Sequence, residues 1–148
     1  MRDGMSYLAP KVGIVPTVQT NSSAAIVGEI IDRLGFESVT FIVITGTLTD
    51  ADATFAVTLA ESDDSGMSGS NAVAAADLIG ADATNSALTN ASFTFAGDKK
   101  AFMLGYKGTK RYLQMTVTPT NNDAGTAPIA CAAIRHGANQ RPTANPPT

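Results

Sequence analysis

Histidine and cysteine carry much of the acid–base, nucleophilic and metal chemistry of proteins, and this chain has one of each, His136 and Cys131. One His and one Cys cannot build a multi-His or multi-Cys zinc site within a single chain. A nucleophilic triad would have to join a Ser or Cys131 to His136 and a carboxylate, and the sequence contains no Gly-x-Ser-x-Gly elbow. His136 also falls where the last expected strand meets the chain's tail. We therefore predict no catalytic residue and no enzymatic activity.

Two close groups of carboxylates are the next candidates for chemistry. Asp50 and Asp52 resemble the start of a calcium loop, but the downstream Gly and bidentate Glu of an EF-hand are missing. Asp63 and Asp64 precede a Gly/Ser-rich loop, where neighbouring Asp residues more often contact solvent than substrate. The sequence thus predicts no metal site and no bound cofactor. Asp63 and Asp64 remain candidates for contact with a protein partner.

A basic group follows over residues 99–111. Its members are Lys99, Lys100, Lys107, Lys110 and Arg111. Two interpretations stay open: a docking surface for an acidic protein partner, or ordinary solvated turns. Tyr106 and Tyr112 lie nearby, as in nucleic-acid sites, but the net charge of the chain is −3, and we expect no nucleic-acid partner.

Charge is distributed unevenly along the 148 residues. Residues 50–98 hold eight acidic and no basic side chains, whereas residues 99–148 hold seven basic side chains and one acidic one. Such asymmetry can steer a protein to a charged partner. Alternatively, strands from the two halves pair within one fold and the charges mix. Only 16% of the residues are charged, against about 25% in an average soluble domain, which agrees with a surface partly covered by a partner.

Short segments rich in Val, Ile, Thr and Phe predict strands, because branched and aromatic side chains suit a pleated surface. They span residues 11–19, 25–33, 38–45, 53–61, 91–95, 101–106, 111–118 and 128–135. Residues 38–45 are apolar on both faces, which indicates an interior strand or one with a face at an interface. We expect them to form a hairpin with residues 53–61. A polar connection, residues 62–90, follows, with a short helical turn expected within residues 72–79.

Eight strands without a long helix predict an all-β protein, an antiparallel β-sandwich with jelly-roll topology. An immunoglobulin-like sandwich is the alternative, although its paired Cys and core Trp are missing. We expect residues 1–20 to form an N-terminal arm or edge strand, residues 21–137 a single domain, and residues 138–148 a flexible Pro-rich tail. The sequence contains no signal-peptide-like stretch and no membrane-length apolar run, so we expect synthesis in a cytoplasm and no membrane partner.

One stretch of the chain resembles a known family. Gly105-Tyr-Lys-Gly-Thr-Lys-Arg-Tyr112 leads into a strand that ends in Thr118-Pro119, then comes Asn121-Asn122, and a final strand ends in His136. This layout is similar to tailed-bacteriophage capsid cement, or decoration, proteins of the kind on the Bordetella phage particle. The segments 31–37 and 77–80 also look like that family.

The resemblance implies a jelly-roll structural protein of the virion. Such a protein binds and stabilises the outside of an assembled phage head, and it is made in the cytoplasm of the host bacterium. The implied partners are the major capsid protein and further copies of the chain, as a dimer or trimer. Alternatives are another virion component (a head fibre base, neck or vertex protein) and a ligand-binding β-sandwich module.

Overall fold

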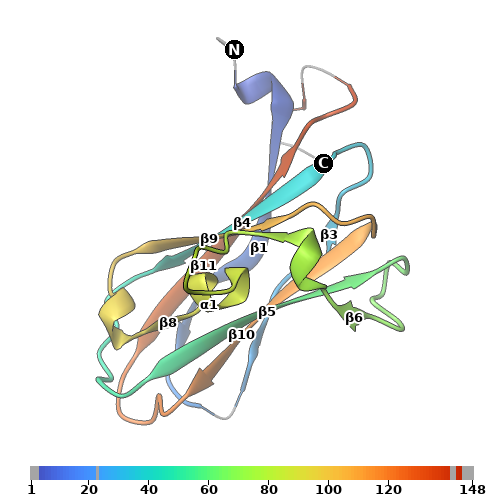
Figure 1. Cartoon of the computed structure of the whole chain (residues 1–148). Helices are drawn as coiled ribbons and strands as arrows, with labels where there is room; N and C mark the ends of the chain where they lie inside the picture. Colours follow the sequence, from blue (N-terminus) through green and yellow to red (C-terminus); the bar gives the residue numbers. More distant parts are fainter. Residues whose placement is uncertain (1–3, 23, 141–142, 145–148) are drawn as a thin grey trace.

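The computed structural model describes residues 4–22, 24–140 and 143–144, and these form two antiparallel sheets packed face to face (Figure 1). The first sheet has five strands in the order β1 (Leu8–Gln19), β11 (Ala127–His136), β4 (Ser38–Thr45), β9 (Ala101–Tyr106) and β7 (Leu78–Ile79). Its strands β4 and β9 coincide with segments rich in branched and aromatic side chains, which suit a pleated surface.

The second sheet is built around β10 (Tyr112–Thr120) and β5 (Thr54–Ser62), which pair over nine residues each. Short strands complete it: β2 (Ile26–Val27) and β3 (Ile31–Asp32) pair with β10, and β6 (Asn71–Ala72) and β8 (Phe93–Thr94) pair with β5. Strand β5, from the acidic half of the chain, therefore pairs with β10, which directly follows Lys110 and Arg111, and charges far apart in sequence become neighbours.

The pairings nest from the ends of the chain inward: β1 with β11, β2 and β3 with β10, β4 with β9, and β5 with β6 and β8. This nesting is a ribbon rolled into a barrel-like sandwich, which is the jelly roll. The predicted fold class is confirmed. The expected hairpin between residues 38–45 and 53–61 is wrong, because β4 and β5 lie in different sheets and the connection between them crosses from one to the other.

The core lies between the sheets and is filled by the inward-facing member of each alternating pair. Phe41, Leu104, Leu113 and Met115 are at most 1% exposed. Three rings, Phe55, Phe93 and Phe102, stack in series with centroids 4.9 and 5.1 Å apart. A one-turn helix, α1 (Ala87–Ala91), contacts both β5 and β9 and closes one side of the sandwich. The sequence did not indicate this helix, whose first turn is capped by Ser86.

The other side is closed where residues 25–33, expected as one strand, break into β2 and β3. At the break, the Gly28 amide donates to the Met115 carbonyl at 2.8 Å, and the Glu29 amide donates to the Gly13 carbonyl, on the opposite sheet, at 2.7 Å. A Cβ on Gly28 would lie 2.3 Å from that Gly13 oxygen. Only glycine lets the two backbones approach this closely.

Three 3₁₀ turns complete the fold: Met5–Tyr7, Ala75–Asp77 and Phe95–Gly97. The second lies within residues 72–79, where a helical turn was expected. Within residues 1–20, the described part is mostly β1, at the edge of the five-stranded sheet. Within residues 138–148, Ala138 is buried, and the Thr143 hydroxyl donates to the Leu8 carbonyl at 2.6 Å. In the described residues no helix is both long and apolar enough to cross a membrane.

Candidate interaction surface

The outer face of the five-stranded sheet is apolar across its strands. Cross-strand partners point to the same side of a sheet, and the register therefore identifies the side chains that share this face. We call the following set the apolar face: Pro10, Val12, Val18, Ile42, Ile44, Ile79, Ala101, Met103, Pro128, Ala130, Ala132 and Ile134. None of these side chains is charged, and Thr40 is the polar residue within their rows; the adjoining row on the same side of the sheet, Leu8–His136–Ser38, carries two polar side chains.

Several members of the apolar face are open to solvent. Met103 is 64% exposed, Val12 52% and Ile44 50%. The row Val12–Ala132–Ile42–Met103 crosses four strands without interruption by a polar group. A contiguous exposed patch of this kind marks an interaction site, because a soluble surface normally scatters its apolar residues singly.

The outer face of the second sheet has the opposite character. Thr54, Thr58, Thr116 and Thr118 face outward from β5 and β10, while Phe55, Val57 and their neighbours face the core. Their hydroxyls can hydrogen-bond to water, so this face needs no partner. The contrast between the two faces shows that the apolar face is not a general property of this threonine-rich sandwich.

The apolar face is hollowed at one end of β11. A depression of about 330 Å³ lies between Val18 of β1 and Ile44 of β4, with Pro128 and Ala130 among its lining residues. The small side chains of β11 create the depression, since larger residues stand on the strands on either side. The face therefore combines ridges with a groove.

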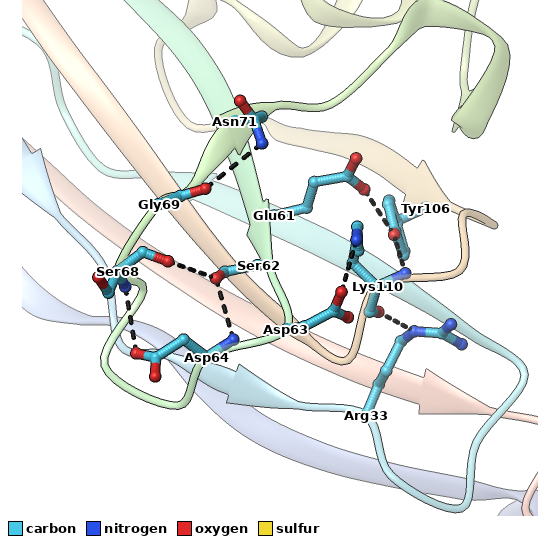
Figure 2. A network of polar contacts seen from close by, with 10 residues as sticks. All are labelled: Arg33, Glu61, Ser62, Asp63, Asp64, Ser68, Gly69, Asn71, Tyr106 and Lys110. Carbon is cyan, nitrogen blue, oxygen red and sulfur yellow. Dashed lines mark hydrogen bonds and ion pairs between the residues drawn. The ribbon is translucent and has the colours of Figure 1, made fainter.

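A polar network occupies one end of the sandwich, where the 62–70 and 107–111 loops meet (Figure 2). The hydroxyl of the buried Tyr106 donates to Glu61 Oε2 at 2.7 Å and accepts from the Lys110 amide at 2.9 Å. Burial and the neighbouring Glu61 carboxylate raise the pKa of Tyr106, so the phenol stays protonated. Gly108 is required here, because a Cβ would lie 2.5 Å from the Tyr106 hydroxyl.

The charged side chains around this network pair with one another. Lys110 Nζ bonds Asp63, and the ammonium lowers the pKa of that carboxyl. The Arg33 guanidinium donates to the Lys110 carbonyl and lies 5.6 Å from the centre of the Tyr106 ring. A hollow of about 410 Å³ runs beside Asp63, Asp64 and Lys110. The network ties the two loops together.

The predicted basic group is divided by the fold. Lys99 and Lys100 lie at the opposite end of β9 from Lys107 and Lys110, and six residues of strand separate them by roughly 20 Å. Arg111 forms a two-contact ion pair with Asp32 at 2.7 and 2.9 Å. These side chains do not make one patch.

The other predicted contacts have local roles. Asp64 Oδ1 accepts from the amides of Gly66 and Ser68 and shapes its own loop. Lys99 lies 3.6 Å from Asp98, Lys100 donates to the Ala96 carbonyl at 2.8 Å, and Lys107 is exposed. Contact of these residues with a partner stays a prediction. The apolar face was not among the predicted sites, although the two apolar sides of residues 38–45 indicated it.

His136 and Cys131 do not meet in a site. They lie on opposite sides of β11, with Cys131 facing the core and its Sγ 3.8 Å from Met115 Sδ. Burial raises the pKa of the Cys131 thiol to about 12 and lowers the pKa of His136. Asp50 accepts from the Ala124 amide at 2.8 Å. No group of three or more His, Cys, Asp or Glu side chains suited to a metal ion occurs in the part of the chain that the structure describes.

A cavity of about 780 Å³ lies between the 34–36 loop and residues 138–140 and 143–144. The buried Arg135 borders it; its guanidinium donates to the Asp32 carbonyl at 3.1 Å and stacks over Phe36 with 4.5 Å to the ring centre. Arg135 takes a buried, inward-facing position near the end of β11. From the sequence alone it could not be distinguished from an exposed charged residue at the end of a strand. These contacts fasten the loop to the strand.

No protein-family model matches the sequence, and no curated protein is significantly similar to it. Solved structures share its fold. A Clostridium thermocellum endo-1,4-beta-D-xylanase 10B structure comprising CBM22-1 and GH10 modules, complexed with xylohexaose, superposes with a TM-score of 0.50 at 12% identity. That superposition covers 92% of this chain and 27% of the other.

Two weaker similarities accompany it. The C-terminal family 22 carbohydrate-binding module of Clostridium thermocellum Xyn10B gives a TM-score of 0.42 at 11% identity, over 93% of this chain and 99% of that one. The infectious bursal disease virus Gx strain structure gives 0.36 at 14% identity, over 90% and 33%. At these identities the similarity to the xylanase structure shows the fold alone: this chain is an all-β sandwich.

Proposed function

We propose that this chain is a structural virion protein that decorates the outside of an assembled phage head and stabilises it. The observation that carries the proposal is the apolar face. A charge-free surface on five strands of an otherwise polar protein is stable in water when a partner covers it. A protein whose work is to bind other subunits needs such a surface and needs no catalytic group.

Two further observations support an assembly role. The stretch from Gly105 to His136 resembles capsid cement proteins, and in the fold it forms β10, β11 and the loops that end them. The jelly roll holds these strands rigidly, so many identical copies can present the same contacts to a shell. Repeated weak contacts around a shell add up, because each later contact of a linked assembly is intramolecular.

A ligand-binding module is the alternative function, and the surface argues against a sugar. Carbohydrate sites generally offer flat aromatic rings, which supply a large amphipathic contact area. Among the described residues Phe95, at 39%, is the one aromatic side chain more than about a third exposed. Neither outer sheet face presents a row of rings.

The copy number of this chain relative to coat protein in purified particles tests the proposal. We expect a fixed ratio near one, or a simple fraction such as one third, by quantitative gel or mass spectrometry. A handful of copies per particle would instead place the chain at a vertex, neck or fibre. Absence from particles would refute a virion role.

A further inference from the structure

We infer that the apolar face is the interface between two copies of this chain, which pack sheet against sheet about a two-fold axis. The inference rests on the proposed function, since it names the partner of the same surface, but it can be tested on the purified protein alone. Four observations favour a second copy over another occupant: charge, shape, area and the state of the sheet edges.

Charge is the first observation. In a two-fold interface each residue can meet its own counterpart, so a charge near the axis would face a like charge. The apolar face carries none. Interfaces between identical subunits are also more apolar and poorer in charge than those between separately stable partners. The neighbouring second sheet, with its threonine surface, lacks this character.

Shape is the second observation. Met103 and Ile44 stand out on the β4–β9 side, and the depression of about 330 Å³ lies at one end of β11, where Ile44 borders it. A surface that contains both a ridge and a hollow can be complementary to itself, because a two-fold rotation brings the ridge of each copy to the hollow of the other. The small side chain of Ala130 in the hollow allows close approach.

Area is the third observation. With strands about 4.8 Å apart and residues rising about 3.4 Å each, the four long strands over the seven residues from Pro128 to Ile134 outline roughly 450 Å² of flat sheet. Two such faces bury about 900 Å², and the corrugation of the side chains and Ile79 of the two-residue β7 raise this toward the size of a specific protein interface.

The sheet edges are the fourth observation, and they exclude the simplest competing mode of self-association. Strand β1 is the long free edge of the five-stranded sheet, but it contains Pro10 and Pro16 and two register irregularities. Proline lacks the donor that strand pairing needs, and bulges twist an edge away from a straight partner. The opposite edge, β7, has two residues. Face-to-face packing is therefore favoured over a continuous sheet.

A dimer of this kind leaves both ends of each sandwich uncovered. The loops with Asp63, Lys107 and Lys110 lie at one end, and Lys99 and Lys100 lie at the other. These charged loops, together with the threonine face, remain available for coat-protein contacts.

Sedimentation equilibrium of the purified full chain tests the inference. We expect a dimer at about 10–100 µM, with a double variant, Ile44→Lys with Met103→Lys, weakening self-association by at least ~100-fold. The replaced side chains are at least half exposed, so the variant should keep its fold, which circular dichroism and burial of Cys131 will verify. The matched control, Thr54→Lys with Thr118→Lys, adds the same charge to the other sheet and should remain dimeric.

Three results would overturn the inference: a monomeric wild type over this range, a trimer, or a dimer that persists in the Ile44/Met103 variant. The outcome of this test can be told apart from the outcome of the copy-number test of the proposed function. A monomer found at a fixed ratio in particles would keep the decoration role and assign the apolar face to the coat protein. A dimer absent from particles would keep the interface and remove the role.

Discussion

Replacing Tyr106 with phenylalanine removes one hydroxyl from the inside of the sandwich and should destabilise the fold measurably. The hydroxyl joins Glu61 Oε2 and the Lys110 amide at 2.7 and 2.9 Å. Phenylalanine keeps the packing of the ring and its contact with Arg33, so the loss falls on these two hydrogen bonds alone. No new cavity larger than an oxygen atom is made.

The magnitude follows from the two bonds. A hydrogen bond to a charged group contributes about 1.5–3 kcal/mol, and an unsatisfied buried donor costs about 1–3 kcal/mol. Water can reach Glu61, which is half-buried, and replaces part of its bond. We therefore expect a loss of about 2–3 kcal/mol, which corresponds to a fall in melting temperature of roughly 5–10 °C for a domain of this size.

Urea unfolding followed by circular dichroism is the assay, with Tyr112→Phe as the matched control. The Tyr112 ring is half-buried beneath Arg111, and its hydroxyl makes no hydrogen bond to any described residue. The control should lie within about 0.5 kcal/mol of the wild type. If Tyr106→Phe also stays within that margin, the two bonds do not stabilise the junction of the loops, and the reasoning fails.

Three further predictions concern other parts of the fold. Gly28→Ala places a Cβ 2.3 Å from a backbone oxygen and should lower the free energy of unfolding in urea by at least about 2 kcal/mol. The control Gly4→Ala, whose Cβ meets nothing within 4 Å, should leave that free energy unchanged. Equal stabilities of the two variants would contradict the close approach at Gly28. Cys131, 3% exposed and with its pKa raised to about 12, should resist a thiol reagent at pH 8 until urea unfolds the chain, and prompt labelling of the native protein would be inconsistent with this core. His136, whose pKa burial lowers, should titrate by NMR below its usual value of 6.5. Because the folded state resists this proton, stability should decline as pH falls from 6.5 through the folded pKa, and His136→Asn should remove that decline; a midpoint at or above 6.5 would refute the burial.

The position of each long strand could be predicted from the sequence because alternation is a local property. Residues 38–45 and 101–106 match β4 and β9 to the residue, and parity places Val39, Phe41 and Val43 on one face; because both faces of that strand are apolar, only the structure shows that this one is buried. The short strands, the break at Gly28 and the helix α1 could not, since their pairings depend on atoms far away in the chain. The Gly28 amide, for example, bonds a residue 87 positions later.

The candidate site was predictable only in part. The apolar outer side of residues 38–45 indicated an interface, but Val12, Ala132 and Met103 look unremarkable until the register places them in one row. The basic group appeared continuous in the sequence, yet β9 carries its members to opposite ends. Lys110 instead meets Asp63, and Arg111 meets Asp32, at separations of 47 and 79 residues.

The sequence by itself determined the class of the protein: strands rather than helices, and two sheets rather than one. These follow from residue type and spacing, which act within a few residues. The tertiary structure alone decided which strands pair, that β4 and β5 belong to different sheets, and that one sheet face is left without a charged group. Those outcomes depend on how apolar surfaces from the whole chain are buried together, because burial free energy depends on the total area removed from water and not on local order.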